Sequence, residues 1–334
     1  MSYSKVKLSK NHVEWSLFNS SVSQSCRRFL HILRGDDPKG EADFYVQYMC
    51  GAGSGTLIRL NNKFFILTAF HVVEEYVGLS ESERNTSPFW FPLSDGRGVS
   101  NIYDFLYPSK MYFIGDMIGD GDGDGWVDFS DVVMIEICDI IPPFLPNGFI
   151  DLSPENFKSK IINKENFFEG QSLNCVGFPF EMNDFKYEVS DEMLEKGVTH
   201  STNLLRHTDV GICLFDQQKV PFVALRRYIV DNKIQGFDDF LSVTRDLNDD
   251  FSRDGMSGGV VFNMMEEGVE PLWAGMIVSG STNFMRRFIP AYVMKDAILN
   301  YSNARCLILD YEREAREVEM SNKGYRMDEK DRYK

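Results

Sequence analysis

A serine flanked by glycines is the pattern in this chain that best suits nucleophilic chemistry. It lies in Asp254-Gly255-Met256-Ser257-Gly258-Gly259, directly before the apolar run 260–262. A glycine two residues before a serine lets the backbone turn sharply, so that two nearby N–H groups can point at one spot beside the hydroxyl. Such a turn could form an oxyanion hole next to a nucleophile. A tight loop between two strands has a similar sequence, so the interpretation depends on a histidine and an aspartate elsewhere.

His71 is the histidine whose position suits a general base. The chain contains five histidines, and His71 follows the strand-like run 63–67 and precedes a predicted helical turn over 72–76. A histidine at the rim of a core can also be purely structural, and an isolated one is more often so. The position at the end of a buried strand therefore has to be weighed together with its neighbours.

Asp131 is the expected orienting carboxylate, because it stands directly before the apolar run 132–137. An aspartate held at the edge of a sheet could accept a hydrogen bond from His71, which fixes the tautomer and stabilises the imidazolium. Asp128, three residues earlier, is the fallback. If Asp131 were to bind calcium, the orienting role would pass to Asp128 or another carboxylate.

The acidic segment from Asp120 to Asp131 has a second interpretation as a calcium loop. Its spacing places oxygen ligands at positions 1, 3, 5 and 9 and a glycine at position 6 of a twelve-residue loop. Position 12 is Asp131, where a glutamate usually gives bidentate ligation, and a strand is expected next instead of a helix. An acidic turn is the favoured interpretation, so no cofactor is required, and bound calcium is the minority alternative.

Composition excludes several classes of function. The chain has 334 residues, is 43% hydrophobic and carries a formal net charge of −15, which indicates a globular protein and argues against nucleic-acid binding through a basic surface. No run approaches the roughly 18 apolar residues of a membrane span, and no secretory signal is evident. The six cysteines show no zinc spacing, and several lie in apolar runs, which favours buried thiols and a cytoplasmic location.

The order of the predicted elements indicates a mostly β protein. A helix is expected over 20–33, a hairpin with its turn at Asn61-Asn62, a second set of strands after the proline-rich break 140–148, and a helix after Pro290. We expect four parts: a peripheral segment (1–41), a first β-barrel (42–142), a second β-barrel with a C-terminal helix (143–300) and a charged helical or disordered tail (301–334). The segments 77–125 and 180–210 are expected insertions of unassigned role.

Three motifs stand in the order His, Asp, Ser: Leu67-Thr68-Ala69-Phe70-His71-Val72, Asp131-Val132-Val133-Met134-Ile135, and the serine turn at 254–259. Together they resemble the chymotrypsin/trypsin-like serine peptidase family, especially its bacterial intracellular and HtrA-like branches, over roughly residues 42–300. Val176-Gly177-Phe178-Pro179 is similar to a strand of the family's second barrel. No PDZ-like domain is seen after residue 300. The resemblance implies two six-stranded antiparallel β-barrels with a C-terminal helix and peripheral helical segments.

The resemblance also implies a role for each matched residue. Ser257 would be the nucleophile, His71 the general base and acid, and Asp131 the orienting carboxylate, while the N–H groups of Gly255 and Ser257 would form the oxyanion hole. The strand 273–280 is similar to the one that lines the primary specificity pocket, which places Ser279 and Gly280 there.

Two departures from the family pattern bear on activation and specificity. Met256 stands where secreted members have an aspartate that pairs with a freshly cleaved N-terminus, so that ion pair is not expected. Phe251 stands where trypsin itself has an acid that selects basic side chains, so an apolar preference is the direct inference, and Asp249 or Asp250 could reach the pocket floor after a small loop shift.

The resulting expectation is a cytoplasmic serine endopeptidase that acts on proteins or peptides through an acyl-enzyme intermediate. A regulatory protein partner is expected to restrain it, whereas neither nucleic acid nor a membrane is expected as a partner. A catalytically inactive binding or regulatory module on the same fold, and a calcium-binding regulatory protein built on the Asp120 loop, remain open alternatives.

Overall fold

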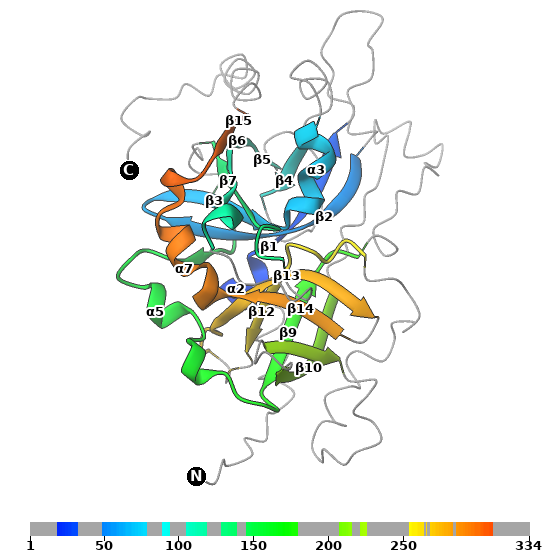
Figure 1. Cartoon of the computed structure of the whole chain (residues 1–334), viewed down its shortest axis with the longest axis vertical. Helices are drawn as coiled ribbons and strands as arrows, with labels where there is room; N and C mark the ends of the chain where they lie inside the picture. Colours follow the sequence, from blue (N-terminus) through cyan, green and yellow to red (C-terminus); the bar gives the residue numbers. More distant parts are fainter. Residues whose placement is uncertain are drawn as a thin grey trace, which may run out of the picture.

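The fold is taken from a computed structural model of the whole chain (Figure 1). It describes residues 19–32, 49–78, 89–93, 105–118, 128–138, 145–179, 207–215, 221–225, 254–263, 265, 268–282 and 285–309. Two β-structures lie one above the other in Figure 1, with the serine turn at their junction. Within the described residues, no helix has the length and apolar character needed to cross a bilayer.

The first β-structure is a sheet of nine strands among the described residues. Its order is β15-β6-β7-β3-β2-β1-β4-β5, and β8 pairs with β2 in parallel. The strands are β1 (Cys26–Ile32), β2 (Met49–Leu60), β3 (Lys63–Thr68), β4 (Phe89–Pro92), β5 (Phe105–Leu106), β6 (Pro108–Tyr112), β7 (Val133–Ile137), β8 (Ile150–Asp151) and β15 (Cys306–Ile308).

The hairpin between β2 and β3 forms as the sequence predicts. Asn61 and Asn62 have φ angles of 50° and 65°, and Leu60 pairs with Lys63 across the turn. Asparagine tolerates this left-handed region better than most residues, so the two-residue turn needs no glycine. The hairpin sets the register that places Thr68, the last residue of β3, beside Val133 of β7.

The second β-structure is a closed barrel with the strand order β10-β11-β14-β13-β12-β9. Its strands are β9 (Ser172–Gly177), β10 (His207–Phe215), β11 (Pro221–Leu225), β12 (Val260–Asn263), β13 (Trp273–Thr282) and β14 (Met285–Pro290). All of its strand pairs are antiparallel. This closed six-stranded barrel confirms the predicted mostly β fold class, whereas the first half is the larger sheet described above.

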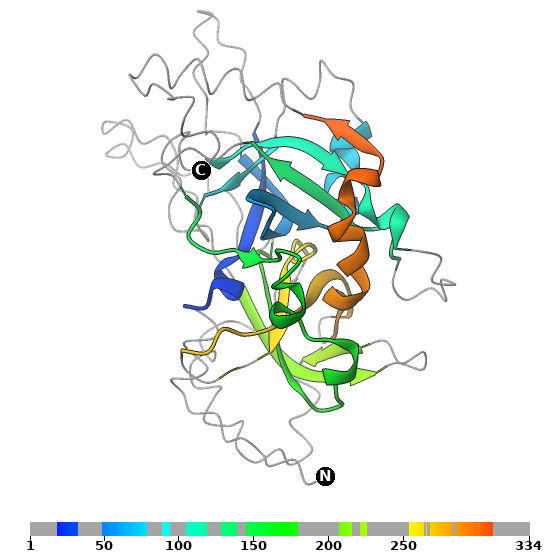
Figure 2. The same cartoon turned by 90° about the vertical axis from the view of Figure 1, so that its left-hand side faces the viewer.

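The remaining elements are short except for two nine-residue helices. They are α2 (Ser21–Gln24), α3 (Phe70–Gly78), η3 (Ile114–Met117), α5 (Phe157–Lys160), η4 (Lys164–Asn166), α7 (Ala291–Leu299) and η7 (Tyr301–Asn303). The helix α7 begins after Pro290, as the proline predicts. Figure 2 shows α7 and β15 following one side of the molecule from the barrel up to the first sheet.

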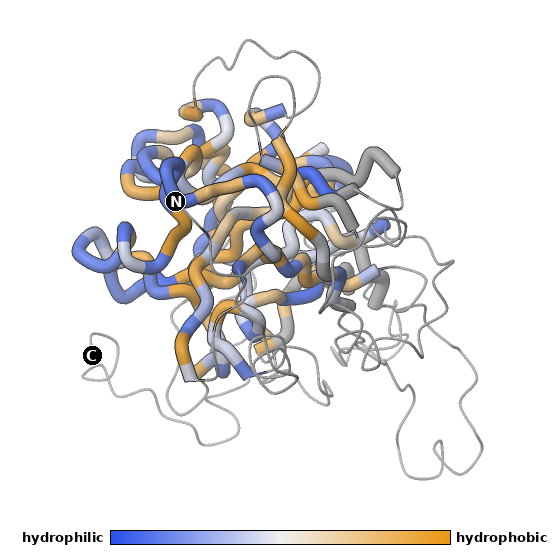
Figure 3. Tube along the Cα trace, turned by 90° about the horizontal axis from the view of Figure 1, so that it is seen from below, coloured by the Kyte–Doolittle hydropathy of each residue, from blue (hydrophilic) through white to orange (hydrophobic). Residues whose placement is uncertain are grey.

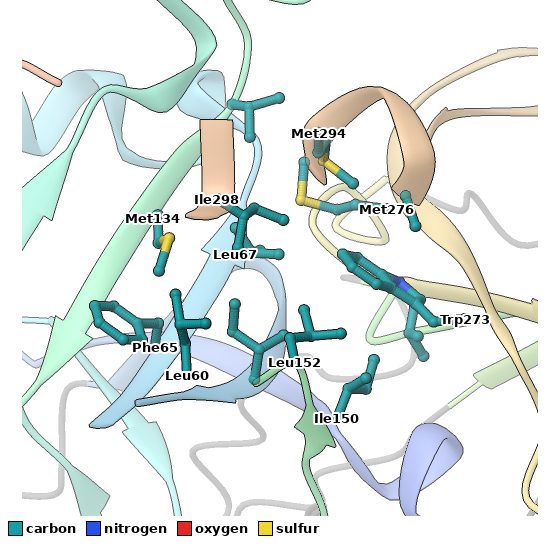
Figure 4. Close-up of a cluster of buried hydrophobic side chains, with 14 of the residues drawn as sticks. Leu60, Phe65, Leu67, Met134, Ile150, Leu152, Trp273, Met276, Met294 and Ile298 are labelled. Atoms are coloured by element: carbon teal, nitrogen blue, oxygen red, sulfur yellow. The ribbon is translucent and has the colours of Figure 1, made fainter. Parts of the chain in front are cut away.

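One apolar cluster joins the two β-structures. Figure 4 shows Leu67 of β3 beside Ile298 of α7, with Met276 and Trp273 of the barrel close by. Trp273 is fully buried and donates its indole N–H to the carbonyl of Gly275 at 2.8 Å. Because both halves bury side chains in a common core, the sheet and the barrel stabilise each other's position. Figure 3 shows hydrophobic segments running through the interior and hydrophilic ones mostly at the periphery.

The helix predicted over 20–33 is wrong, because only Ser21–Gln24 is helical and Cys26–Ile32 forms β1. This strand pairs with β2 on one side and β4 on the other, so part of the segment expected to be peripheral lies inside the first sheet. The end of the chain also differs from the expected helical tail. Residues 306–308 form β15, which pairs with β6, and residues 310–334 lie outside the described residues.

Candidate active site

The end of β3 and the start of β7 bring His71 next to Asp131. Thr68 pairs with Val133 in the sheet, so the residues that follow β3 must lie beside those that precede β7. The helix α3 begins at Phe70, whose N–H donates to the Asp131 carbonyl at 3.2 Å. The two residues are therefore placed together by strand register and by this main-chain contact.

His71 donates twice to the Asp131 carboxylate. Its main-chain N–H lies 2.8 Å from Oδ1, and its ring Nδ1 lies 2.7 Å from Oδ2. The hydrogen bond to Asp131 raises the pKa of His71 above its usual value, burial opposes this, and the charges of Asp131 and Glu74 raise it further. With Nδ1 bonded to the carboxylate, the neutral imidazole presents Nε2 as an acceptor, which is the tautomer a general base needs.

The loop that carries Asp131 is held by backbone contacts. Gly115 donates its N–H to the Val132 carbonyl at 3.0 Å, and a Cβ at this glycine would lie 2.6 Å from the carbonyl oxygens of Phe129 and Ser130. The fallback carboxylate, Asp128, accepts hydrogen bonds from the N–H and hydroxyl of Ser130. The structure thus pairs His71 with Asp131 and gives Asp128 a local role in the turn.

The serine turn uses two glycines in the left-handed region. Gly255 and Gly258 have φ angles of 93° and 88°. A Cβ at Gly258 would overlap the Ser54 carbonyl oxygen and lie 2.5 Å from Thr68 Oγ1. Glycine is required at this position by both the conformation and the close approach of β2. The turn is thereby held against β2, which pairs with β3, the strand that leads into α3 and His71.

The strand β2 connects the serine turn to the start of α3. Ser54 donates its N–H to the Ser257 carbonyl at 2.9 Å. A Cβ at Gly53 would lie 2.6 Å from Val72 Cγ1 and 3.4 Å from the same Ser257 carbonyl. Val72 and Ser257 therefore approach the same glycine, and the residue next to Val72 is His71. The serine turn and the start of α3, which are distant in sequence, therefore meet at this stretch of β2.

The Ser257 hydroxyl donates to the main-chain carbonyl of Val278 at 3.1 Å. Val278 lies in an irregularity of the β13–β14 register, between Ile277 and Ser279, so its carbonyl is available to the serine. Among the described residues, Ser257 and His71 form no hydrogen bond with each other. The hydroxyl is therefore engaged with Val278 and not with His71.

The N–H groups of the turn fall into two sets. Those of Gly258 and Gly259 donate to the carbonyls of Ile277 and Met256 at 2.7 and 2.9 Å. Within the described part of the chain, those of Gly255, Met256 and Ser257 have no hydrogen-bond partner. The N–H groups of Gly255 and Ser257 are the two expected to form an oxyanion hole, and their role stays a prediction.

Met256 is 1% exposed and packs into the apolar cluster inside the barrel. It anchors the serine turn through apolar contacts. The sequence already indicated that this position, which is not an aspartate, forms no ion pair with an N-terminus. A Cβ at Gly177 of β9 would lie 3.0 Å from the side chain of Met256, so the barrel wall and the turn are in close contact.

The predicted specificity pocket is only partly within the described residues. Phe251, Asp249 and Asp250 lie outside them. Ser279 and Gly280 lie on β13, where Ser279 pairs with Arg287 of β14. Their assignment to a substrate pocket remains a prediction.

The predicted calcium loop also lies mostly outside the described residues, which begin again at residue 128. Among the described residues no cluster of three or more histidine, cysteine or carboxylate side chains could hold a metal ion. Calcium binding therefore stays an untested alternative.

Three hydroxyl residues of the site were not predicted from the sequence. Ser54, Thr56 and Thr68 are fully buried, and each forms a hydrogen bond that ties the sheet to the serine turn or to its neighbour. Thr56 donates to the Gly258 carbonyl at 3.0 Å, and Thr68 donates to the Ser54 carbonyl at 2.8 Å. Small hydroxyl residues among glycines, as in Gly53-Ser54-Gly55-Thr56, are the signal that could have indicated a close backbone approach.

Comparisons with known proteins give little beyond the structure itself. No protein-family model matches the chain, and no curated protein sequence matches it. Among solved structures, the chain is similar to a thermostable serine protease, AL20, from an extremophilic microorganism, at 10% sequence identity and a TM-score of 0.41. The similarity covers 85% of this chain and 99% of that one.

Proposed function

We propose that this protein is a serine endopeptidase in which Ser257 attacks the substrate carbonyl, His71 takes the proton and Asp131 orients the imidazole. The observation that carries the proposal is the double hydrogen bond from His71 to Asp131. It holds the ring in the tautomer that a general base requires, beside the segment of β2 that also contacts the serine turn.

The proposed reaction proceeds through an acyl-enzyme. Ser257 rotates away from Val278, transfers its proton to His71 and forms a bond with the carbonyl carbon of a peptide. The N–H groups of Gly255 and Ser257 stabilise the oxyanion, and the imidazolium then protonates the leaving amine. Water activated by the neutral His71 releases the acyl group and regenerates the serine. No cofactor takes part in this scheme.

The proposed setting is the cytoplasm, with a protein or peptide as substrate and a regulatory protein as a partner. Two of the described cysteines, Cys175 and Cys213, are buried and form no disulfide, and burial raises the pKa of the Cys213 thiol to about 12. Buried thiols outside disulfides fit a reducing compartment, which supports this location.

A fluorophosphonate probe tests the proposal. The wild-type protein should be labelled at Ser257 and should cleave a denatured protein substrate, whereas Ser257→Ala should do neither. Ser159→Ala is a matched control, because Ser159 is an exposed serine whose hydroxyl donates to the Asn156 carbonyl at 2.7 Å, and it should label normally. Absence of labelling of the wild type from pH 5 to 9, or labelling of Ser257→Ala, would favour the catalytically inactive module instead.

A further inference from the structure

Ser54 is the residue through which the first sheet holds the serine turn. It is fully buried in β2, and each of its polar groups forms a hydrogen bond. Its N–H donates to the Ser257 carbonyl at 2.9 Å, and its carbonyl accepts from Thr68 Oγ1 at 2.8 Å. Its hydroxyl donates to the Gly255 carbonyl at 2.8 Å and accepts from the Phe178 N–H at 2.9 Å.

These bonds fix the peptide planes around the proposed nucleophile. Three successive carbonyls of the turn have partners: Gly255 with Ser54 Oγ, Met256 with the Gly259 N–H, and Ser257 with the Ser54 N–H. Only the first of these bonds depends on a side chain. It acts on Gly255, which is the one of the three residues with a φ of 93° and with no side chain to restrict it.

The Gly255 carbonyl lies between the two proposed oxyanion donors. It belongs to the rigid peptide unit that joins the Gly255 Cα to Met256, so the bond from the Ser54 hydroxyl fixes the peptide unit that lies between the N–H of Gly255 and that of Ser257. Together with the bond from the Ser54 N–H to the Ser257 carbonyl, it limits how far the neighbouring peptide units of the turn can rotate. Preorganised donors contribute to catalysis because they need no rearrangement as charge develops on the substrate oxygen.

Ser54 also connects the turn to the end of β9. Phe178, which donates to the hydroxyl, is fully buried and follows the last residue of that strand. The hydroxyl accepts from the barrel wall and donates to the turn, so one side chain sets the distance between them. The Ser54 side chain is fully buried, and loss of its hydroxyl would leave the Gly255 carbonyl and the Phe178 N–H without that partner.

We propose that Ser54 is a positioning residue that holds Gly255 in the orientation required for the oxyanion hole. This inference rests on the proposed function, because it assigns a catalytic benefit to the order of the turn. Loss of the Ser54 hydroxyl should therefore reduce the stabilisation of the transition state more than the affinity for the substrate. A small misplacement of a catalytic group can reduce the rate by about 100-fold.

The test compares Ser54→Ala with Ser25→Ala. Ser25 is also a fully buried serine next to the first sheet, and its hydroxyl donates to the Val22 carbonyl at 2.6 Å, so both variants lose a buried hydroxyl. Ser54→Ala should lower kcat by about 100-fold with KM nearly unchanged. It should also weaken the binding of a peptide boronate, which mimics the tetrahedral intermediate, by a similar factor. Ser25→Ala should retain kcat.

The amide hydrogen exchange of Gly258 and Gly259, whose N–H groups are hydrogen-bonded in the turn, provides a readout that does not need activity. It should accelerate in Ser54→Ala and not in Ser25→Ala. A wild type that does not react with the probe would disprove the proposed function, whereas the exchange comparison would still decide whether Ser54 orders the turn. Unchanged exchange, or a kcat for Ser54→Ala equal to that of Ser25→Ala, would overturn the inference. If Ser54→Ala fails to fold, Ser54→Cys keeps the shape with a weaker donor and is judged by the same criteria.

Discussion

Both oxygens of the Asp131 carboxylate accept hydrogen bonds from the same residue, His71, one through the main chain and one through the ring. This double contact fixes the position of the histidine as well as the rotation of its ring. The His71 side chain is 46% exposed and that of Asp131 is 19% exposed, so the aspartate is sheltered while the ring remains accessible. Such an arrangement suits a base that must be held firmly and yet reach a substrate.

Replacing Asp131 by asparagine should lower the rate of reaction with the fluorophosphonate probe by roughly 10⁴-fold, because the ring would lose its tautomer and its charge partner. His71 acts as a base only when neutral. Its raised pKa places the midpoint of the wild-type pH profile above 6.5, with activity rising as pH increases through it. Asp131→Asn should shift this midpoint to lower pH.

The control for this prediction is Asp128→Asn, which removes the carboxylate first considered as a fallback. Its partner is Ser130 and not His71, so the pH midpoint should stay at the wild-type value. A midpoint that moves with Asp128 and not with Asp131 would contradict the assignment.

The ion pair between His71 and Asp131 should also stabilise the fold below pH 6.5, and this contribution should fade as pH rises through the raised pKa of His71.

Met256→Asp should destabilise the protein, because the side chain at this position lies in an apolar cluster of the barrel. The side chain is 1% exposed and faces the inside of the barrel. Burial of an unpaired carboxylate should reduce the free energy of unfolding by about 3–5 kcal/mol.

Met256→Leu is the matched control, since it keeps the volume and should cost less than about 1.5 kcal/mol. Denaturant unfolding of both variants measures the difference. A Met256→Asp variant as stable as the wild type would mean that an unrecognised cation reaches this part of the turn.

Local sequence signals predicted the parts of the fold that depend on local physics. The Asn61-Asn62 turn, the helical start near His71 and the helix after Pro290 all follow from backbone preferences within a few residues. The pairing of His71 with Asp131 was also anticipated, because a histidine at the end of one strand and an aspartate at the start of another can meet at a sheet edge.

Long-range pairing accounts for what the sequence did not indicate. The segment 26–32 has apolar residues at a spacing that also fits a helix, and its extended form is stabilised by β2 and β4, which come later in the chain. Strand β15 is only three residues long and exists through its pairing with β6. The proposed role of Ser54 depends on Gly255, which is 201 residues away. The local pattern around Ser54 could indicate a close backbone approach, but it does not identify Gly255 as the partner.

Gly258 should tolerate substitution much less than Gly268, although both have a positive φ, of 88° and 82°. An alanine at Gly268 would meet nothing within 4 Å, so it should cost only the backbone strain of about 1–2 kcal/mol. An alanine at Gly258 carries the same strain and also collides with the backbone of Ser54. Gly258→Ala should therefore lose more than about 4 kcal/mol of the free energy of unfolding, together with probe labelling, whereas Gly268→Ala should label normally. Thermal unfolding and probe labelling of the two variants distinguish the steric contact with β2 from the conformational preference of glycine. Equal losses of stability and labelling in the two variants would show that β2 does not restrain the serine turn at this point.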